Sequence, residues 1–352
     1  MSFLLLAAMA VGALATRDVP VDATNRGSIV GKPEFVVSVD ALVDEGEKAY
    51  QELLAIDDSG QEEMDRLIRE ADARGPGVDN AALQKQIDDR IASVDKAYRG
   101  FLGRYSDHAR ARVAYGSFLN DTAREFEALE QWEKALKLDP KNPAIYNNLA
   151  GVYGHRGPVT NAFAYYEKAI ELDPKEPVYA QNFATAVFLF RQDVMDHYGI
   201  TNEQQVFDKA LGLYRRAAEL DPRSFYIATD LAQTFYGIKP ARHEEALAAW
   251  KKAFQLAGDE LEREGVRVHL ARVFVQAGKF AEARAQLNLI TNVNYGESKT
   301  RILRTMETKL VRESDLPLKP GAPGRPAESP SVVSSATNDL KAPVIVPVRP
   351  GS

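Results

Sequence analysis

The sequence has no cysteine among its 352 residues. This absence excludes disulfide bonds, thiolate metal sites and cysteine nucleophiles, and it also excludes a membrane anchor in which cysteine carries a lipid. A chain without cysteine suits both oxidising and reducing compartments. The compartment must therefore be inferred from another part of the sequence.

Histidine is scarce, and the motifs of common enzyme classes are missing. The five histidines form no His-Glu-x-x-His pair, the spacing that puts two metal ligands on one helix face. A Walker-type phosphate loop, a GxSxG elbow and a glycine-rich dinucleotide turn are also missing. We interpret the adjacent Asp196 and His197 as a solvent-exposed polar pair. We therefore expect no enzymatic activity, cofactor, metal or small-molecule substrate.

An excess of positive charge is missing as well. The formal net charge is −6, whereas binding to nucleic-acid phosphates requires a basic surface, so we expect no nucleic-acid partner. Hydrophobic residues make up 45% of the chain, an ordinary share for a soluble protein that buries a sizeable core.

One apolar run stands out, from Phe3 to Ala15, and it closes with the small-x-small pattern of Ala13, Leu14 and Ala15. It is shorter than the roughly 20 residues that span a bilayer, and it fits a signal peptide over residues 1–15, although no Lys or Arg precedes it. We therefore expect an exported protein of the periplasm or cell envelope. An uncleaved membrane tether and an ordinary buried segment are the alternatives. Membrane contact is expected only through this segment, if it stays uncleaved.

A phrase built on Asp-Pro is present three times, as KLDPKNP at 137–143, ELDPKEP at 171–177 and ELDPRSF at 219–225. The second copy starts 34 residues after the first, and the third starts 48 residues after the second. Residues 143–176 have helical periodicity in both halves and a break at Gly157-Pro158. Such a helical hairpin cannot cover its own apolar faces, so it must stack on copies of itself.

The length of this unit, with its aromatic, small and proline positions, resembles the tetratricopeptide repeat. The resemblance implies an all-α fold, a right-handed α-solenoid of stacked helix-turn-helix repeats. Five units are expected within 109–294, at 109–142, 143–176, 177–224, 225–260 and 264–294. They align on one small residue in each helix, where the two helices should touch: Gly116 with Ala128, Ala150 with Ala162, Ala184 with Ala210, Ala232 with Ala246, and Ala271 with Ala283.

The third unit is longer than the others between its two small residues. The additional residues keep a helical pattern, which predicts that both helices are lengthened into a raised hairpin. Gly199 is a plausible end for the first helix, and Thr201 with Gln204 forms a capping box that starts the second. The hairpin would serve either as a ridge where a partner docks or as a cover for the N-terminal helices.

The flanks complete the predicted layout. Residues 38–108 form N-terminal helices, with helical patterns over 40–56 and 61–73 and a long apolar stripe from Leu83 to Tyr105, which act as a cap or a degenerate repeat. Residues 295–313 form a C-terminal capping helix. Residues 16–37 are expected to be a flexible segment, and the proline-rich residues 314–352 a disordered tail.

The resemblance also implies a binding surface, because the first helices of successive repeats line a concave face that contacts extended peptides. The matching positions are Asn147, Asn148, Gln181, Asn182, Thr229, Asp230 and His269. Side-chain amides at a regular spacing can pair with the N–H and C=O groups of a peptide. The alternative is that these residues are simply polar, exposed helix positions. Val113 and Ser117 stand where the Lys and Asn of a chaperone-type carboxylate clamp would be, so that clamp is absent.

These patterns predict a scaffold for protein–protein interaction, which binds a peptide or protein segment on the concave face of the solenoid. The alternative function is a structural subunit of an envelope assembly, which docks through the convex face and the extended hairpin of the third repeat.

Overall fold

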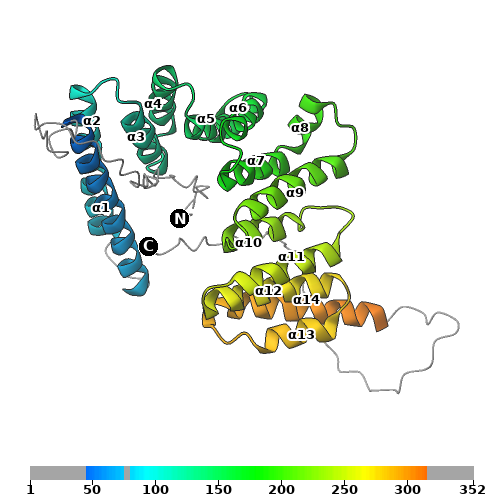
Figure 1. Ribbon diagram of the computed structural model, residues 1–352. Coiled ribbons are helices and arrows are strands. Elements are labelled where there is room, and N and C mark those ends of the chain that lie inside the picture. Colours follow the sequence, from blue (N-terminus) through cyan, green and yellow to red (C-terminus); the bar gives the residue numbers. More distant parts are fainter. Residues whose placement is uncertain (1–44, 75–79, 315–352) are drawn as a thin grey trace, which may run out of the picture. The chain divides into compact units, whose positions relative to one another are not determined.

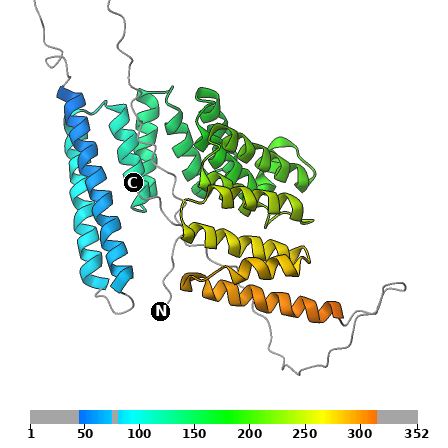
Figure 2. The same ribbon diagram turned by 60° about the horizontal axis from the view of Figure 1, so that its bottom comes forward.

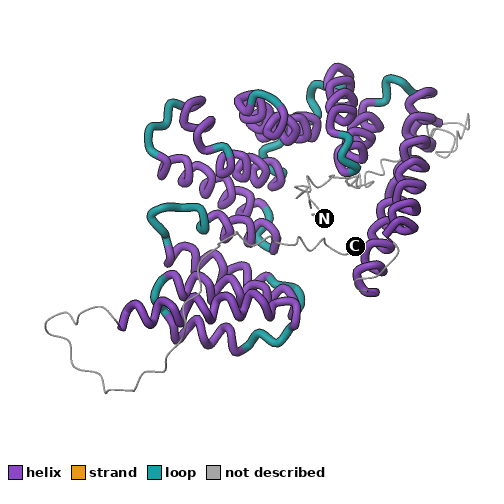
Figure 3. Tube along the Cα trace, turned by 180° about the vertical axis from the view of Figure 1, so that it is seen from behind, coloured by secondary structure: helices purple, strands orange, loops and turns teal. Residues whose placement is uncertain are grey.

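The computed structural model describes residues 45–74 and 80–314. These residues form fourteen α-helices and one short 3₁₀-helix, and they contain no strand (Figures 1 and 3). The fold is an all-α solenoid of stacked helix-turn-helix units, as the sequence predicts. The expected signal peptide, the flexible segment at 16–37 and nearly all of the expected tail lie outside the described residues.

The helices have the following bounds: α1 Glu45–Arg74, α2 Asn80–Arg104, α3 Ala109–Asp121, α4 Glu125–Leu138, α5 Pro143–Arg156, α6 Val159–Leu172, α7 Pro177–Leu189, α8 Arg191–Tyr198, α9 Glu203–Leu220, α10 Phe225–Thr234, α11 His243–Leu256, α12 Glu260–Gln276, α13 Phe280–Asn288, η2 Val293–Tyr295 and α14 Gly296–Ser314. The pairs α3–α4, α5–α6, α7–α9, α10–α11 and α12–α13 each pack as a hairpin. Consecutive hairpins also touch, through α4–α5, α6–α7, α9–α10 and α11–α12 (Figure 2).

Small residues allow the two helices of each hairpin to approach closely. All ten predicted positions, from Gly116 to Ala283, are buried. At Gly116 a Cβ atom would lie 2.6 Å from Cδ1 and 2.8 Å from Cε2 of the Trp132 ring. The predicted aromatic positions on the second helices are buried too, at Trp132, Tyr166, Tyr214 and Trp250. The repeated spacing in the sequence therefore marks the contact between paired helices.

The Asp-Pro phrase ends one helix and prepares the next. Its aspartates, Asp139, Asp173 and Asp221, cap the C-termini of α4, α6 and α9, and each side chain accepts a hydrogen bond from the backbone N–H two residues later. The proline cannot continue a helix. Within the first copy, Asn142 accepts a hydrogen bond from Ala144 N at 3.1 Å and so caps the start of α5.

The insertion in the third repeat differs from the prediction. The first helix is not lengthened as one rod, because α7 ends at Leu189 and Phe190, with φ −101° and ψ 46°, separates it from α8. Helix α8 does not stand above its neighbours. It packs against α6, α7 and α9, and Val194 is fully buried in that contact. The Tyr198 hydroxyl donates to Glu167 of α6 at 2.6 Å. The insertion therefore covers α6 of the preceding repeat.

The helix ends within the insertion agree better with the prediction from the sequence. Gly199 stops α8 with φ 65°, a left-handed conformation that favours glycine. The second helix, α9, is lengthened to 18 residues as predicted. Its N-cap is Asn202, whose side chain accepts from Gln204 N at 2.9 Å, so the predicted cap at Thr201 is wrong by one residue.

The N-terminal region is simpler than the sequence suggests. The helical patterns predicted over 40–56 and 61–73 belong to one helix, because α1 runs without interruption from Glu45 to Arg74. Gly60 lies against α2, and a Cβ there would be 2.6 Å from Cγ2 of Val94. The glycine is therefore a site of close approach between α1 and α2 rather than a helix break. At the other flank α14 spans Gly296–Ser314, which agrees with the helix predicted at 295–313.

Within the described residues, no helix combines the length and apolar character needed to cross a membrane.

Candidate functional site

The predicted site residues on α5 are less exposed than the sequence suggests. The residues of Asn147 and Asn148 are only 3% and 8% exposed. Buried amides need hydrogen-bond partners because an unsatisfied polar group is costly to bury. The partners of these two side chains therefore decide what they can do.

An amide ladder connects the first helices of three successive repeats. Asn182 Nδ2 on α7 donates to Asn147 Oδ1 at 2.9 Å, and Asn147 Nδ2 donates to Asn148 Oδ1 at 3.3 Å. Asn148 Nδ2 then donates to Ser117 Oγ on α3 at 3.4 Å. The amides of Asn147 and Asn148 are therefore engaged with each other and with their neighbours. They hold α3, α5 and α7 in register.

A second group of polar residues connects α7 with α10. Gln181 Nε2 donates to Asp230 Oδ2 at 2.6 Å. Burial raises the pKa of the Asp230 carboxyl, and the hydrogen bond from Gln181 partly opposes that rise. In the part of the chain that the structure describes, no Lys or Arg forms an ion pair with Asp230. The site thus holds a carboxylate whose charge is not neutralised by a neighbouring cation.

Two hydroxyl groups, those of Thr185 and Tyr214, contact each other near this group, and the charge of Asp230 acts on Tyr214. Thr185 Oγ1 donates to the backbone oxygen of Gln181, one turn earlier, and lies 2.7 Å from the Tyr214 hydroxyl. Burial, followed by the charge of Asp230, raises the pKa of Tyr214, so its hydroxyl stays protonated at neutral pH. Thr185 is not among the site residues expected from the sequence. Its position four residues after Gln181, on the same helix face, is the signal that could have found it.

Two other predicted site residues make different contacts. Thr229 Oγ1 donates to Tyr226 O at 2.9 Å within its own helix. The ring of His269 stacks on Trp250, with centroids 4.2 Å apart and planes inclined by 1°, and its Nδ1 lies 2.9 Å from the Tyr236 hydroxyl. Burial lowers the pKa of His269 to about 4, so the ring is neutral at pH 7. His269 therefore belongs to an aromatic stack and does not join the ladder.

We call the surface formed by Gln181, Asn182 and Asp230, with the ladder residues Asn147 and Asn148 beneath it, the first-helix face. Its three outer residues are half-buried rather than enclosed. They present their oxygen atoms as hydrogen-bond acceptors, and Gln181 and Asn182 each keep one further N–H group, since each amide donates one hydrogen bond within the face.

Asp196 and His197 are the remaining candidates for chemistry. Asp196 and His197 are both exposed on α8, as predicted, and Asp196 accepts a hydrogen bond from Gln192 at 3.0 Å. No cluster of three or more His, Asp or Glu side chains suited to a metal ion occurs among the described residues.

Two sequence-family models match the chain. One, described as TPR repeat, matches residues 127–157, and the other, described as Tetratricopeptide repeat, matches residues 143–176. A comparison with curated proteins gave no match.

Several solved structures are similar to the chain. PilW, a widely conserved type IV pilus biogenesis factor, is similar with a TM-score of 0.50 and 16% sequence identity, over 63% of this chain and 95% of that one. TTC0263, a thermophilic TPR protein of Thermus thermophilus, is 21% identical over 56% of this chain and 99% of that one, with a TM-score of 0.40. YrrB, a TPR protein with an unusual peptide-binding site, is 14% identical over 62% of this chain and 99% of that one, with a TM-score of 0.42.

The identity to PilW is too low to transfer a function, so the likeness concerns the fold. That fold, the two sequence-family matches and the buried small residues that align the hairpins lead to one conclusion. The chain contains tetratricopeptide repeats, which the family models match within residues 127–176.

Proposed function

We propose that this protein is a non-enzymatic scaffold that binds an extended segment of a partner protein at the first-helix face. Its tetratricopeptide repeats support a role in protein–protein interaction. The observation that carries the more specific proposal is Asp230, a half-buried carboxylate bonded to Gln181 and without a cationic partner among the described residues.

The residues of the face have different roles in this proposal. Asn147 and Asn148 are buried and bonded to each other, so they position α5 against its neighbours. Gln181, Asn182 and Asp230 are the contact residues, because they are half-buried and keep free lone pairs on their oxygen atoms. Thr229, beside Asp230 on α10, lies at the edge of the contact.

The chemistry of the face selects the kind of segment that binds. Oxygen acceptors pair with the backbone N–H groups of an extended peptide and with the side chain of Lys or Arg. A cation close to Asp230 would also favour its ionised form, which burial disfavours. An acidic segment would be repelled. The proposed ligand is therefore an extended segment with a Lys or Arg side chain.

A panel of fluorescent peptides that differ only at one position, where Lys, Gln or Glu is placed, tests this proposal by fluorescence anisotropy. We expect the Lys peptides to bind most tightly. Asp230→Asn keeps an oxygen for the bond from Gln181 but removes the charge, and it should weaken the Lys peptides roughly tenfold. Asp196→Asn removes an exposed charge on α8 and serves as the control. Equal binding of Lys and Glu peptides, or an Asp230→Asn variant that binds like the wild type, would refute the proposal.

A role in an envelope assembly is the second candidate. It is supported by the apolar run from Phe3 to Ala15, which has the composition of an export signal. Docking would then involve the exposed side of α8, where Gln192, Asp193 and Asp196 face solvent. Deleting the insertion is a poor test, since it would remove the buried Val194. Cell fractionation, with N-terminal sequencing of the recovered protein, tests export directly, and recovery only from the cytoplasm would contradict it.

A further inference from the structure

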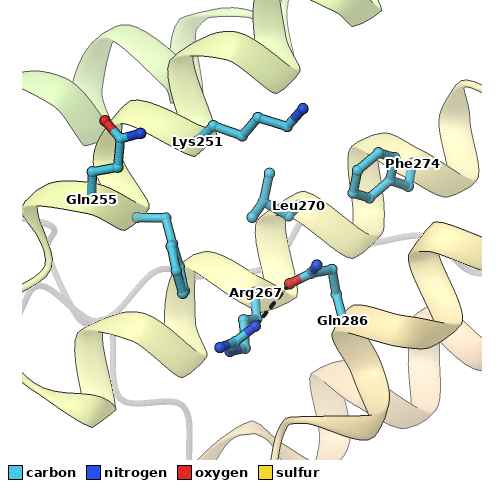
Figure 4. Close-up of a pocket in the computed structure, with 7 residues that line it drawn as sticks. Lys251, Gln255, Arg267, Leu270, Phe274 and Gln286 are labelled. Atoms are coloured by element: carbon cyan, nitrogen blue, oxygen red, sulfur yellow. Dashed lines mark hydrogen bonds between the residues drawn. The ribbon is translucent and has the colours of Figure 1, made fainter.

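A small cavity lies between α11, α12 and α13, and its volume is about 250 Å³. Lys251, Phe254 and Gln255 come from α11, Arg267, Leu270 and Phe274 from α12, and Gln286 from α13. Figure 4 shows these side chains grouped around the cavity from the three helices. The lining thus combines two cations, two amides and an apolar floor.

The cavity is distinct from the first-helix face. Successive residues of an α-helix turn by about 100°, so Arg267, Leu270 and Phe274 share one side of α12. Val268 and His269, which hold the positions on α12 that correspond to the ladder residues, turn toward roughly the opposite side. A ligand in the cavity would therefore not compete for the surface that carries Asp230.

Only some of the N–H groups of the Arg267 guanidinium form hydrogen bonds within the described residues. The guanidinium lies over the ring of Phe254, with Cζ 4.7 Å from the ring centroid, and its Nη1 donates to Gln286 Oε1 at 3.1 Å. Its Nε is buried and has no hydrogen-bond partner among the described residues. This Nε is closed to solvent, whereas Nη2 is not buried and also makes no hydrogen bond among the described residues, so Nη2 is the donor that an acceptor in the cavity can reach.

The first repeat contains an arginine–glutamine pair at the same positions, and there the arginine has more hydrogen-bond partners. Arg112 and Gln131 are separated by 19 residues, as are Arg267 and Gln286, and Arg112 Nη1 donates to Gln131 Oε1 at 2.8 Å. There, however, Nε and Nη2 of the arginine both donate to the backbone oxygen of Ser106, at 3.0 and 2.6 Å. The corresponding edge of Arg267 is the one that lacks a partner at Nε.

Acidic residues one or two turns from these cations are already engaged with other groups, and Glu245 on α11 pairs with Arg215 at 3.2 Å. Glu264, one turn before Arg267, accepts hydrogen bonds from the backbone N–H groups of Thr291 and Asn292. Glu244, two turns before Lys251 on α11, forms an ion pair with Lys279 at 2.7 Å. In the described part of the chain, neither Lys251 nor Arg267 forms an ion pair with a carboxylate. The two cations of the lining therefore have no direct ion-pair partner, and the charges of Glu264 and Glu244 act on them only from a greater distance.

We propose that this cavity binds a carboxylate that is attached to a small apolar group. The carboxylate meets Nη2 of Arg267, which is not buried and makes no hydrogen bond among the described residues, and Lys251 adds a second cation. The apolar group lies against Phe254, Leu270 and Phe274. The volume is below the range of drug-sized sites, so it suits one side chain, one chain end or a small organic acid.

Ligand-observed NMR with phenylacetate and the full-length protein tests the site. We expect saturation transfer to the phenylacetate ring. Phenylacetamide, which has the same shape without the charge, should bind roughly tenfold more weakly. Arg267→Gln should weaken phenylacetate by a similar factor, whereas Arg112→Gln, which removes the matching arginine of the first repeat, should not.

A second variant guards against misfolding. If the circular dichroism of Arg267→Gln shows a disrupted fold, Lys251→Gln replaces it, because Lys251 is exposed on α11. Its expected loss of phenylacetate affinity is smaller, roughly two- to fivefold, as is typical of an exposed charge. No saturation transfer, equal binding of the amide, or unchanged affinity in the variants would overturn the proposal.

The same assay distinguishes the sources of the carboxylate. A peptide ending in Phe with a free carboxylate, its amidated form and a peptide with an internal Glu are each used to displace phenylacetate. Displacement by the free chain end alone assigns the site to a protein C-terminus, and displacement by the Glu peptide assigns it to a side chain. If neither peptide displaces phenylacetate, the site takes a free organic acid.

Discussion

The close contact between α3 and α4 predicts that Gly116 cannot be replaced even by alanine. A Cβ at this position would lie 2.6 and 2.8 Å from Cδ1 and Cε2 of Trp132, both in the five-membered part of its ring. The ring is held in place, since Trp132 Nε1 donates to the backbone oxygen of Val113 at 3.1 Å. The Trp132 ring or the helix backbone would have to move.

The expected magnitude follows from three terms. Forcing an additional methyl group into a packed core costs about 1–3 kcal/mol, and weakening the bond from Trp132 to Val113 costs about 1 kcal/mol more. Alanine is a better helix former than glycine by about 1 kcal/mol, which opposes both losses. We expect Gly116→Ala to lower the free energy of unfolding by about 1–3 kcal/mol.

Gly212 provides the matched control. It lies within α9, faces solvent, and has no atom within 4 Å of the position of a Cβ. Gly212→Ala should therefore raise stability by about 0.5–1 kcal/mol through helix propensity alone. Urea unfolding followed by circular dichroism measures both variants. The cost of Gly116→Ala should also fall in a Trp132→Phe background, because phenylalanine lacks the five-membered ring. A Gly116→Ala variant as stable as Gly212→Ala would refute the proposed packing of α3 on α4.

Two further predictions concern the insertion and the aromatic stack. Val194→Ala should loosen α8 by about 1–2 kcal/mol, since it removes two buried methyl groups, and hydrogen exchange should show faster exchange in α8 than in α4. His269 has a folded-state pKa of about 4, against 6.5 for an unperturbed histidine. Below pH 6.5 the unfolded chain takes up a proton that the folded chain does not, so stability should fall by up to about 3 kcal/mol between pH 6.5 and pH 4. The difference between the urea midpoints of wild type and His269→Phe over this pH range measures the effect, and a pH-independent difference would contradict it.

Much of the fold was predictable because the repeated positions have a steric cause. Gly116 and the alanines aligned with it are required wherever two paired helices touch. Their spacing in the sequence is therefore sufficient to predict the hairpins. The Asp-Pro phrase marked helix ends for a similar reason, since the aspartate side chain closes a turn that the proline keeps from continuing as helix. Such local rules are readable from a single chain.

The errors arose where distant residues decide the local structure. The continuous α1 depends on Gly60 meeting Val94 of α2, and the separation of α8 from α7 accompanies the burial of Val194 beside α6. Neither contact can be predicted from the residues next to it in the sequence. Helical periodicity therefore gave the number of units and most helix ends, but not the path of the insertion.

The candidate site was predicted in part for the same reason. Register placed Gln181, Asn182 and Asp230 on first helices, but it could not show that Asn147 and Asn148 would bond to each other and be buried. The cavity beside Arg267 was not predicted at all. The matching pair of Arg112 and Gln131, at the same spacing of 19 residues, is the sequence signal that could have drawn attention to it.

Photo-crosslinking gives the most direct test of the central claim, which is that a partner segment binds at the first-helix face. Benzoylphenylalanine in place of Thr229, beside Asp230, should crosslink to the Lys peptide that binds most tightly in the anisotropy panel. The same group in place of Lys252, an exposed residue of α11, is the control. We expect a crosslink at position 229 that unlabelled peptide removes, and little or none at position 252. A peptide that crosslinks as well at position 252, or only there, would contradict the assignment of the binding surface.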